Sequence, residues 1–101
     1  MANSYERFQE LALEVLGRKG VYAILRSLGG GVRRFGLLQQ VSGLPPRTLS
    51  LRLKELESLG WIRRKQYAGT PPRVDYDLTS RGKTLKPLLE AVERWTRQTA
   101  R

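Results

Sequence analysis

The sequence contains neither cysteine nor histidine. Without cysteine, the chain has no disulfide, no thiolate nucleophile and no cysteine-based redox switch. Without histidine, it lacks the commonest general base and the commonest metal ligand, so zinc, copper and iron sites are not expected. Serine–histidine and cysteine–histidine catalysis are excluded. Because the nine carboxylates also form no recognisable acid pair or metal cluster, we expect no enzyme, no metal site and no cofactor.

Long hydrophobic runs are missing as well. The longest, residues 21–25, is far shorter than the ~20 apolar residues of a membrane-spanning helix. The first ten residues include Glu6, Arg7 and Glu10 and have no apolar core of a signal peptide. We therefore expect a cytoplasmic protein that does not bind membranes. A length of 101 residues favours one domain, residues 1–101, with a single modest core.

Positive charge is present in excess. Nineteen Lys and Arg residues against nine Asp and Glu residues give a formal net charge of +10. Residues 18–86 hold 15 of the basic and 4 of the acidic side chains, a net charge of +11, so both ends are near neutral. Fourteen of the basic residues are arginine, whose planar guanidinium suits phosphate and guanine. This distribution indicates a central surface that binds nucleic acid, although an inert basic surface is the alternative.

Apolar side chains recur at helical spacing in four segments before residue 60. Ser4 is expected to cap the first helix, and Pro45-Pro46 precedes the fourth, where proline is tolerated at the first position. A run of three glycines separates the second helix from an expected short strand at residues 32–34. The predicted helices cover about residues 5–16, 21–28, 35–41 and 46–59.

The remaining part of the chain predicts a hairpin and a last helix. Residues 61–67 and 72–78 alternate in polarity and flank a tip of about five residues. Thr79 is expected to cap a helix over about residues 80–98, which Pro87 should bend. A short helix, a turn and a second helix followed by a hairpin form a winged helix-turn-helix. The predicted fold is therefore mostly α with a small β-hairpin wing at about residues 61–78.

The segments in this order resemble the HxlR-type transcriptional regulators of bacteria and archaea. The strongest match is residues 46–57, PRTLSLRLKELE, which resembles the recognition-helix block of the family. Residues 60–64 and 71–79 resemble the two wing strands, and the resemblance extends over about residues 13–95. It implies a dimeric winged-helix regulator that binds DNA and carries terminal helices for dimerisation.

Three departures from the family pattern limit what can be carried over. Lys19-Gly20 stands where the family often has Lys-Trp, so the second helix must pack differently. Leu44-Pro45 stands where the family often has Ile-Ser, so no side-chain cap or serine–phosphate contact is expected there. Some members sense oxidants through an N-terminal cysteine, and this chain has none.

The fourth helix, about residues 46–59, supplies the first group of expected DNA contacts. With its leucines turned inward, its outer face carries basic and hydroxyl side chains near the N-terminus, which is the end that reaches base edges. Arg47 is expected to contact a base or phosphate, and Lys54 a phosphate. Leu51 either touches a thymine methyl group or is an exposed leucine without a role. The predicted contacts on this helix are Arg47, Thr48, Ser50, Leu51 and Lys54.

The wing and the segment before the third helix supply the second group. Lys65 and Arg73 lie nearest the hairpin tip, where a wing meets the minor groove or the backbone. Arg33 and Arg34 lead into the helix-turn-helix and are expected to hold phosphates, although Arg34 has the alternative of packing over the core. Cross-strand pairing of Arg63 and Lys65 with acids of the second strand would cancel part of this charge.

The terminal helices, about residues 4–16 and 80–98, each carry an apolar stripe. In the resembling family these helices build a two-fold dimer, whereas the alternative is that both stripes close the core of the monomer. The predicted interface comprises Tyr5, Phe8, Leu11, Leu85, Leu88, Leu89, Val92 and Trp95.

The sequence therefore predicts a homodimeric, sequence-specific regulator of transcription, a repressor, bound to double-stranded DNA at a pseudo-palindromic operator. One alternative is an architectural protein that coats DNA without sequence preference. Another is a winged helix used as a protein-interaction module. The sequence identifies no effector ligand.

Overall fold

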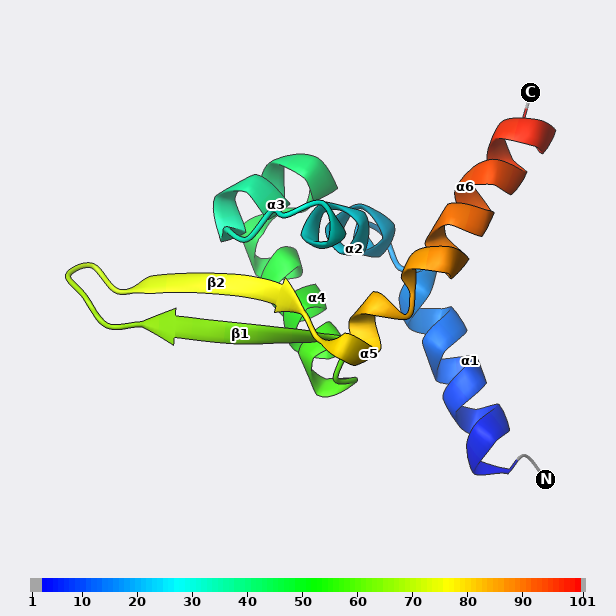
Figure 1. Ribbon diagram of the computed structural model, residues 1–101, viewed down its shortest axis with the longest axis horizontal. Helices are drawn as coiled ribbons and strands as arrows, with labels where there is room; N and C mark the ends of the chain where they lie inside the picture. Colours follow the sequence, from blue (N-terminus) through cyan, green and yellow to red (C-terminus); the bar gives the residue numbers. More distant parts are fainter. Residues whose placement is uncertain (1–2, 101) are drawn as a thin grey trace.

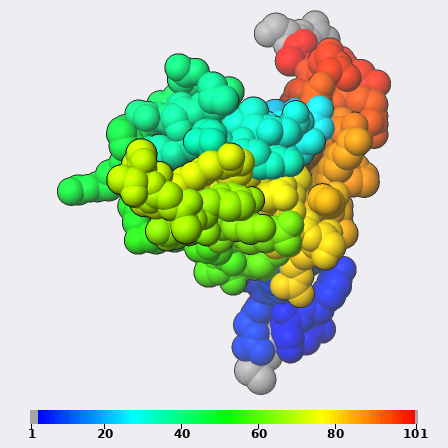
Figure 2. All heavy atoms as spheres, turned by 60° about the vertical axis from the view of Figure 1, so that its left-hand side comes forward, coloured from blue at the N-terminus to red at the C-terminus, as the bar shows by residue number. Residues whose placement is uncertain are grey.

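The computed structural model describes residues 3–100. The central helices form the body of the protein, the hairpin extends from one side, and the first and last helices project from the other side as two arms (Figure 1). Figure 2 shows these arms leaving the body of the protein in opposite directions. The elements are α1 (Ser4–Leu16), α2 (Val21–Gly29), α3 (Phe35–Ser42), α4 (Pro46–Ser58), β1 (Ile62–Tyr67), β2 (Arg73–Leu78), α5 (Ser80–Lys83) and α6 (Lys86–Thr99). The prediction of a mostly helical chain with a hairpin wing is confirmed.

The core lies between α2, α3, α4 and the base of the hairpin. Leu49, Leu53 and Leu56 of α4 are at most 2% exposed, as their spacing predicts. Pro46 occupies the first turn of α4, and no side chain caps this helix. The missing cap was expected from Leu44-Pro45. The inner face of α4 is thus fixed by its leucines, which leaves the opposite face to solvent.

The backbone at Gly20 and its neighbour Leu44 explain why this position holds glycine and not a larger residue. Its φ angle is +87°, in the left-handed region that favours glycine. A Cβ atom there would lie 2.6 Å from Cδ1 of Leu44, a buried residue of the turn between α3 and α4. The leucine fills the space that a larger residue would need, so a side chain at position 20 would displace the turn.

Two local expectations for the first half of the chain are wrong. The cap of α1 is Asn3, whose side chain accepts a hydrogen bond from the Glu6 amide at 2.8 Å, and not Ser4, which begins the helix. Residues 32–34 form no strand, because only one backbone hydrogen bond, from the Tyr76 amide to the Arg33 carbonyl at 2.8 Å, joins them to the hairpin. One backbone hydrogen bond is too few to pair the segment with the hairpin as a strand.

The wing has the expected register and length. Arg63 pairs with Asp77, Lys65 with Asp75, and Tyr67 with Arg73, and the tip comprises residues 68–72. Arg63 and Lys65 therefore stand directly opposite the two acids of β2, whereas Arg64 stands opposite Tyr76.

The last predicted helix is interrupted and not merely bent. α5 ends at Lys83 and α6 begins at Lys86. Pro87 has no amide hydrogen, and in a continuous helix its ring would clash with the carbonyl group of Lys83. Thr79 caps α5 as expected, since its hydroxyl accepts from the Gly82 amide at 3.0 Å. Any Cβ atom at Gly82 would collide with the Trp61 carbonyl group, so α5 lies directly against the base of the wing.

No helix within residues 3–100 is long and apolar enough to cross a membrane. The same residues contain no group of three or more acidic side chains placed to hold a metal ion.

Candidate nucleic-acid interface

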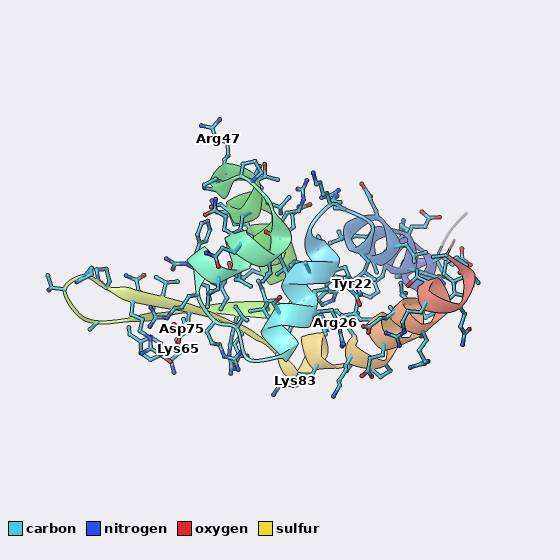
Figure 3. The ribbon with its side chains drawn as sticks, turned by 90° about the horizontal axis from the view of Figure 1, so that it is seen from above. Tyr22, Arg26, Arg47, Lys65, Asp75 and Lys83 are labelled. Carbon is cyan, nitrogen blue, oxygen red and sulfur yellow. The ribbon has the colours of Figure 1, made fainter. Side chains whose placement is uncertain are left out.

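The N-terminal end of α4 presents a cation to solvent. Arg47 projects from the body of the protein, on the side away from α6 (Figure 3). Because α4 begins without a side-chain cap, its first amide groups and the positive end of its dipole are also available to an anion. Arg47, Leu51 and Lys54 are exposed, whereas Thr48 and Ser50 are half-buried. The structure thus places three of the five predicted residues of this helix in solvent and the other two at the edges of its leucine face.

Glu55 forms ion pairs with some of the cations near α4 and not with others. Its carboxylate accepts from Arg52 at 2.9 Å and also pairs with Arg18 at the end of α1. Arg52 is therefore held by a contact within its own helix. Within the part of the chain that the structure describes, Arg47 and Lys54 form no ion pair. Their charge remains available to a ligand.

Asp75 is the central acid of the wing and is only 8% exposed. Arg73 donates to it through Nε at 3.2 Å and through Nη2 at 2.9 Å. Arg34 adds a third contact, with Nε 3.1 Å from Oδ1. The hydrogen bonds from Arg73 are the main reason why the pKa of Asp75 lies below its ordinary value. Arg34 is thus bound to the wing, and its side chain, which is 53% exposed, does not pack over the core.

Asp77 holds a second pair of arginines more loosely. Arg33 and Arg63 each place a guanidinium nitrogen 3.5 Å from its carboxylate. Arg33 also donates to the carbonyl groups of Leu28 and Val32, both at 3.1 Å. The structure therefore places Arg33 beside the wing, but fixes it by backbone contacts and neutralises part of its charge.

The tip-side end of the hairpin carries an aromatic contact that sequence reasoning missed. The ammonium group of Lys65 lies 5.0 Å from the centroid of the Tyr67 ring, and the guanidinium of Arg73 lies 4.9 Å from it. Cations at this distance from an aromatic face are attracted to it. Tyr67 therefore helps to position both cations predicted for the wing, and its alternation with Lys65 on one face of β1 was the signal for it.

The arms expose most of their predicted interface. Among the residues of the two stripes, exposure is 76% for Tyr5, 46% for Phe8, 44% for Val92 and 63% for Trp95. Leu11 and Leu88 are also exposed. By contrast, Leu89 is 6% exposed and Leu85 is half-buried, and both pack against the core of the same chain. The core of the monomer therefore accounts for these two apolar side chains without a second chain.

The family model described as HxlR-like helix-turn-helix matches residues 15–101. An HTH-type transcriptional regulator of Synechocystis is 42% identical over 83 residues, which are 81% of this chain and 62% of that protein. The HTH-type transcriptional regulator YvaP of Bacillus subtilis is 38% identical over 87 residues, 85% of this chain and 81% of that protein. The chain thus spans less than two thirds of the Synechocystis relative.

Solved structures of transcriptional regulators are also similar to this chain. The redox regulator HypR in its reduced form has a TM-score of 0.82 at 32% identity, with 88% of this chain and 89% of that chain covered. A regulator from Enterococcus faecalis, described as a member of the MarR family, has a TM-score of 0.80 at 31% identity, with 99% of this chain and 92% of that chain covered. The winged helix-turn-helix, the family match and these relatives agree: the chain belongs to the HxlR-like helix-turn-helix family.

Proposed function

We propose that the protein is a homodimeric transcriptional regulator, a repressor, that binds a pseudo-palindromic operator. The observation that carries this proposal is a division of the surface. Among residues 3–100, Arg47, Lys54 and Lys65 form no ion pair and lie on α4 and the wing, while the exposed apolar stripes of the two arms lie on α1 and α6, on the other side of the protein. The relatives named as transcriptional regulators support DNA as the ligand of the basic side.

In this proposal α4 enters the major groove with its N-terminal end toward the bases. Arg47 contacts a guanine edge or a phosphate, since arginine to guanine is the commonest specific contact. Thr48, Ser50 and Leu51 contact neighbouring bases, and Lys54 lies one turn further along, near the phosphates. Lys65 and Arg73 bring the wing to the backbone or the minor groove, and Arg33 and Arg34 hold phosphates beside it.

The exposed apolar side chains of the arms form the two-fold interface in this proposal. The six exposed residues of the stripes, together with the half-buried Leu85, would pack against the same surface of a second chain. Residues 1–101 then form one winged-helix domain whose terminal helices dimerise. Two-fold symmetry places the recognition helices about one DNA turn, ~34 Å, apart, which matches a pseudo-palindromic site. As a repressor, the dimer acts by occupying this site.

The high net charge favours one other function, coating of DNA without sequence preference. Competition with random DNA distinguishes the two functions. A regulator binds its site roughly 10³-fold or more tighter than random DNA, whereas a coating protein shows a ratio of the two affinities near one. We expect selected operator DNA to resist competition by random duplex. A ratio near one supports the coating protein, and no DNA binding at low salt supports a protein-interaction module.

Self-association is tested separately by sedimentation. Trp95→Ala removes the largest exposed aromatic side chain of α6, and truncation of such a residue at an interface costs on the order of 2 kcal/mol. We expect it to raise the dissociation constant of the dimer more than tenfold. Arg94→Ala, on a different face of α6, is the matched control. A monomeric wild-type protein contradicts the dimer.

A further inference from the structure

A groove of about 870 Å³ lies between the end of α2, the end of β2, α5 and the first turn of α6. This volume is in the range of sites that bind small molecules. No residue of α4 lines it. The groove is therefore separate from the α4 surface proposed to read bases. It shares only Arg33 with the proposed DNA contacts, and the regulator proposal gives the groove itself no role.

The groove combines an apolar floor with a cationic rim. Leu28, Leu78 and Leu89 form the floor with the small parts of their side chains that remain exposed, and the charged side chains comprise four cations and two carboxylates. One carboxylate, Asp77, is already paired with Arg33 and Arg63, which leaves Glu90 as the other. Among residues 3–100, Lys83 and Lys86 form no ion pair. The rim thus holds two cations without a partner.

The start of α6 adds to the positive potential. The helix begins at Lys86, has 14 residues and carries no side-chain cap. The positive end of its dipole favours negative charge beside it, in addition to the two lysines. On the facing side, Arg26 projects from α2 toward α6, while Lys83 stands at the outer edge of α5 (Figure 3). An anion in the groove would have cations on both sides.

The groove lies on the opposite side of α6 from the exposed apolar stripe. Lys86 and Glu90 line the groove, whereas Leu88 and Val92 belong to the stripe. Residues two apart on a helix are separated by about 200° around its axis. A second chain that covers the stripe therefore leaves the groove open.

We infer that this groove binds a small organic anion, a carboxylate with an apolar body. Lys83, Lys86 and Arg26 bind the carboxylate, and the leucine floor contacts the apolar part. Inorganic phosphate satisfies only the first group of contacts, and a neutral apolar molecule only the second. The occupant therefore needs both features.

Arg26 connects the groove to the position of α6. Its Nη2 atom lies 3.3 Å from Oε2 of Glu93, the same oxygen that accepts a hydrogen bond from the Tyr22 hydroxyl at 2.9 Å. A bound carboxylate competes with Glu93 for Arg26 and weakens one contact between α2 and α6. In the proposed dimer this changes the angle between the arms and the DNA-binding unit. Only this change of angle rests on the proposed function, and the binding of the anion does not.

The binding step is tested without DNA, on the full chain, by amide chemical shifts. Octanoate is the probe, and octanamide and inorganic phosphate are the comparisons. We expect octanoate to cause saturable shifts at the backbone amides of Gly29, Gly30 and Gly82, which line the groove. Octanamide and phosphate should bind about tenfold more weakly or worse, because each loses one class of contact.

Variants assign the contacts to individual side chains. Lys83→Gln and Lys86→Gln are expected to weaken octanoate binding about fivefold each. Lys19→Gln, which removes the same charge from the exposed turn after α1, should leave it unchanged. Circular dichroism confirms that the variants are folded.

Several results would overturn the inference. They are the absence of saturable octanoate shifts up to the solubility limit, shifts confined to other surfaces, and equal binding by the Lys83, Lys86 and Lys19 variants. Octanamide or phosphate binding as tightly as octanoate would equally refute the ligand class. Because no DNA is present, failure here leaves the operator-binding proposal standing, and failure of operator binding leaves the groove intact.

Discussion

The Nε atom of Arg34 lies 3.1 Å from Oδ1 of Asp75, so the segment that leads into α3 is tied to the wing. The same carboxylate binds the guanidinium of Arg73 through two hydrogen bonds. One nearly buried acid therefore orients two proposed phosphate contacts, one from the helix-turn-helix and one from the hairpin. It also neutralises part of their charge, and this favours a defined geometry over general attraction to DNA.

Replacing Asp75 by asparagine should change both the orientation of the two arginines and the charge that they present to DNA. Asp75→Asn removes the charge that holds Arg34 and Arg73, so both arginines become free to contact any phosphate. We expect non-specific DNA affinity to rise and its logarithmic salt slope to become more negative by about 1–2. Binding to the operator relative to random DNA should fall. Glu10→Gln, an exposed acid of α1, makes the same change in net charge, and identical behaviour of both variants would contradict the positioning role.

Arg47 is the most informative position on α4. Arg47→Ala should weaken binding to the operator by roughly 1–3 kcal/mol and leave binding to random DNA nearly unchanged. Arg7→Ala, also an exposed arginine but located on α1, is the control. Titration of both variants against operator and random duplexes measures the difference. Equal losses on both duplexes would make Arg47 a phosphate contact without sequence preference.

The regular parts of this fold could be predicted from the sequence. The leucine spacing of α4 gives its inner face, and the alternation on either side of residues 68–72 gives the hairpin and its register. The pairing of Arg63 with Asp77 follows from that register. These features depend on local periodicity, and a single sequence displays such periodicity directly.

The remaining features depend on contacts between distant segments. The link from Arg34 to Asp75 joins residues 41 positions apart, and no spacing rule indicates it. Leu89 was assigned to the exposed stripe because its position on the helix allows it, whereas the break before Lys86 turns it into the core. The groove beside α6 likewise brings together residues of α2, β2, α5 and α6, which no local spacing rule connects.

Leu88 and Leu89 are adjacent in α6 but differ in exposure, 46% against 6%. Leu89→Ala should therefore lower the free energy of unfolding of the monomer by about 2–5 kcal/mol, the usual cost of a cavity in a core. Leu88→Ala should change it by less than about 1 kcal/mol and should instead weaken self-association. Denaturant unfolding below the dimer dissociation constant, combined with sedimentation, separates these effects. A large loss of monomer stability in Leu88→Ala would place that side chain in the core.

Glu93 should make the position of α6 sensitive to acid. The hydrogen bond from the Tyr22 hydroxyl, followed by that from Arg97, holds the pKa of Glu93 below its ordinary value. A carboxyl whose pKa is lower in the folded state stabilises that state above the unfolded pKa, about 4.3, and this contribution is lost as the pH falls through the folded pKa.

The variant Glu93→Gln isolates this dependence. We expect the wild type to be more stable than the variant at neutral pH, and the difference to shrink as the pH falls below about 4. Urea unfolding at a series of pH values measures it. A difference that stays constant between neutral pH and about pH 3 would show that the carboxylate charge does not hold α6.

Footprinting of the protein on genomic DNA tests the central claim most directly, because it reports sequence preference and symmetry together. We predict protected sites that share a sequence, with two inverted half-sites whose centres lie about 10 base pairs, or a multiple of this, apart. Protection without a shared sequence, or a single half-site without an inverted partner, would contradict a two-fold regulator that reads DNA through α4.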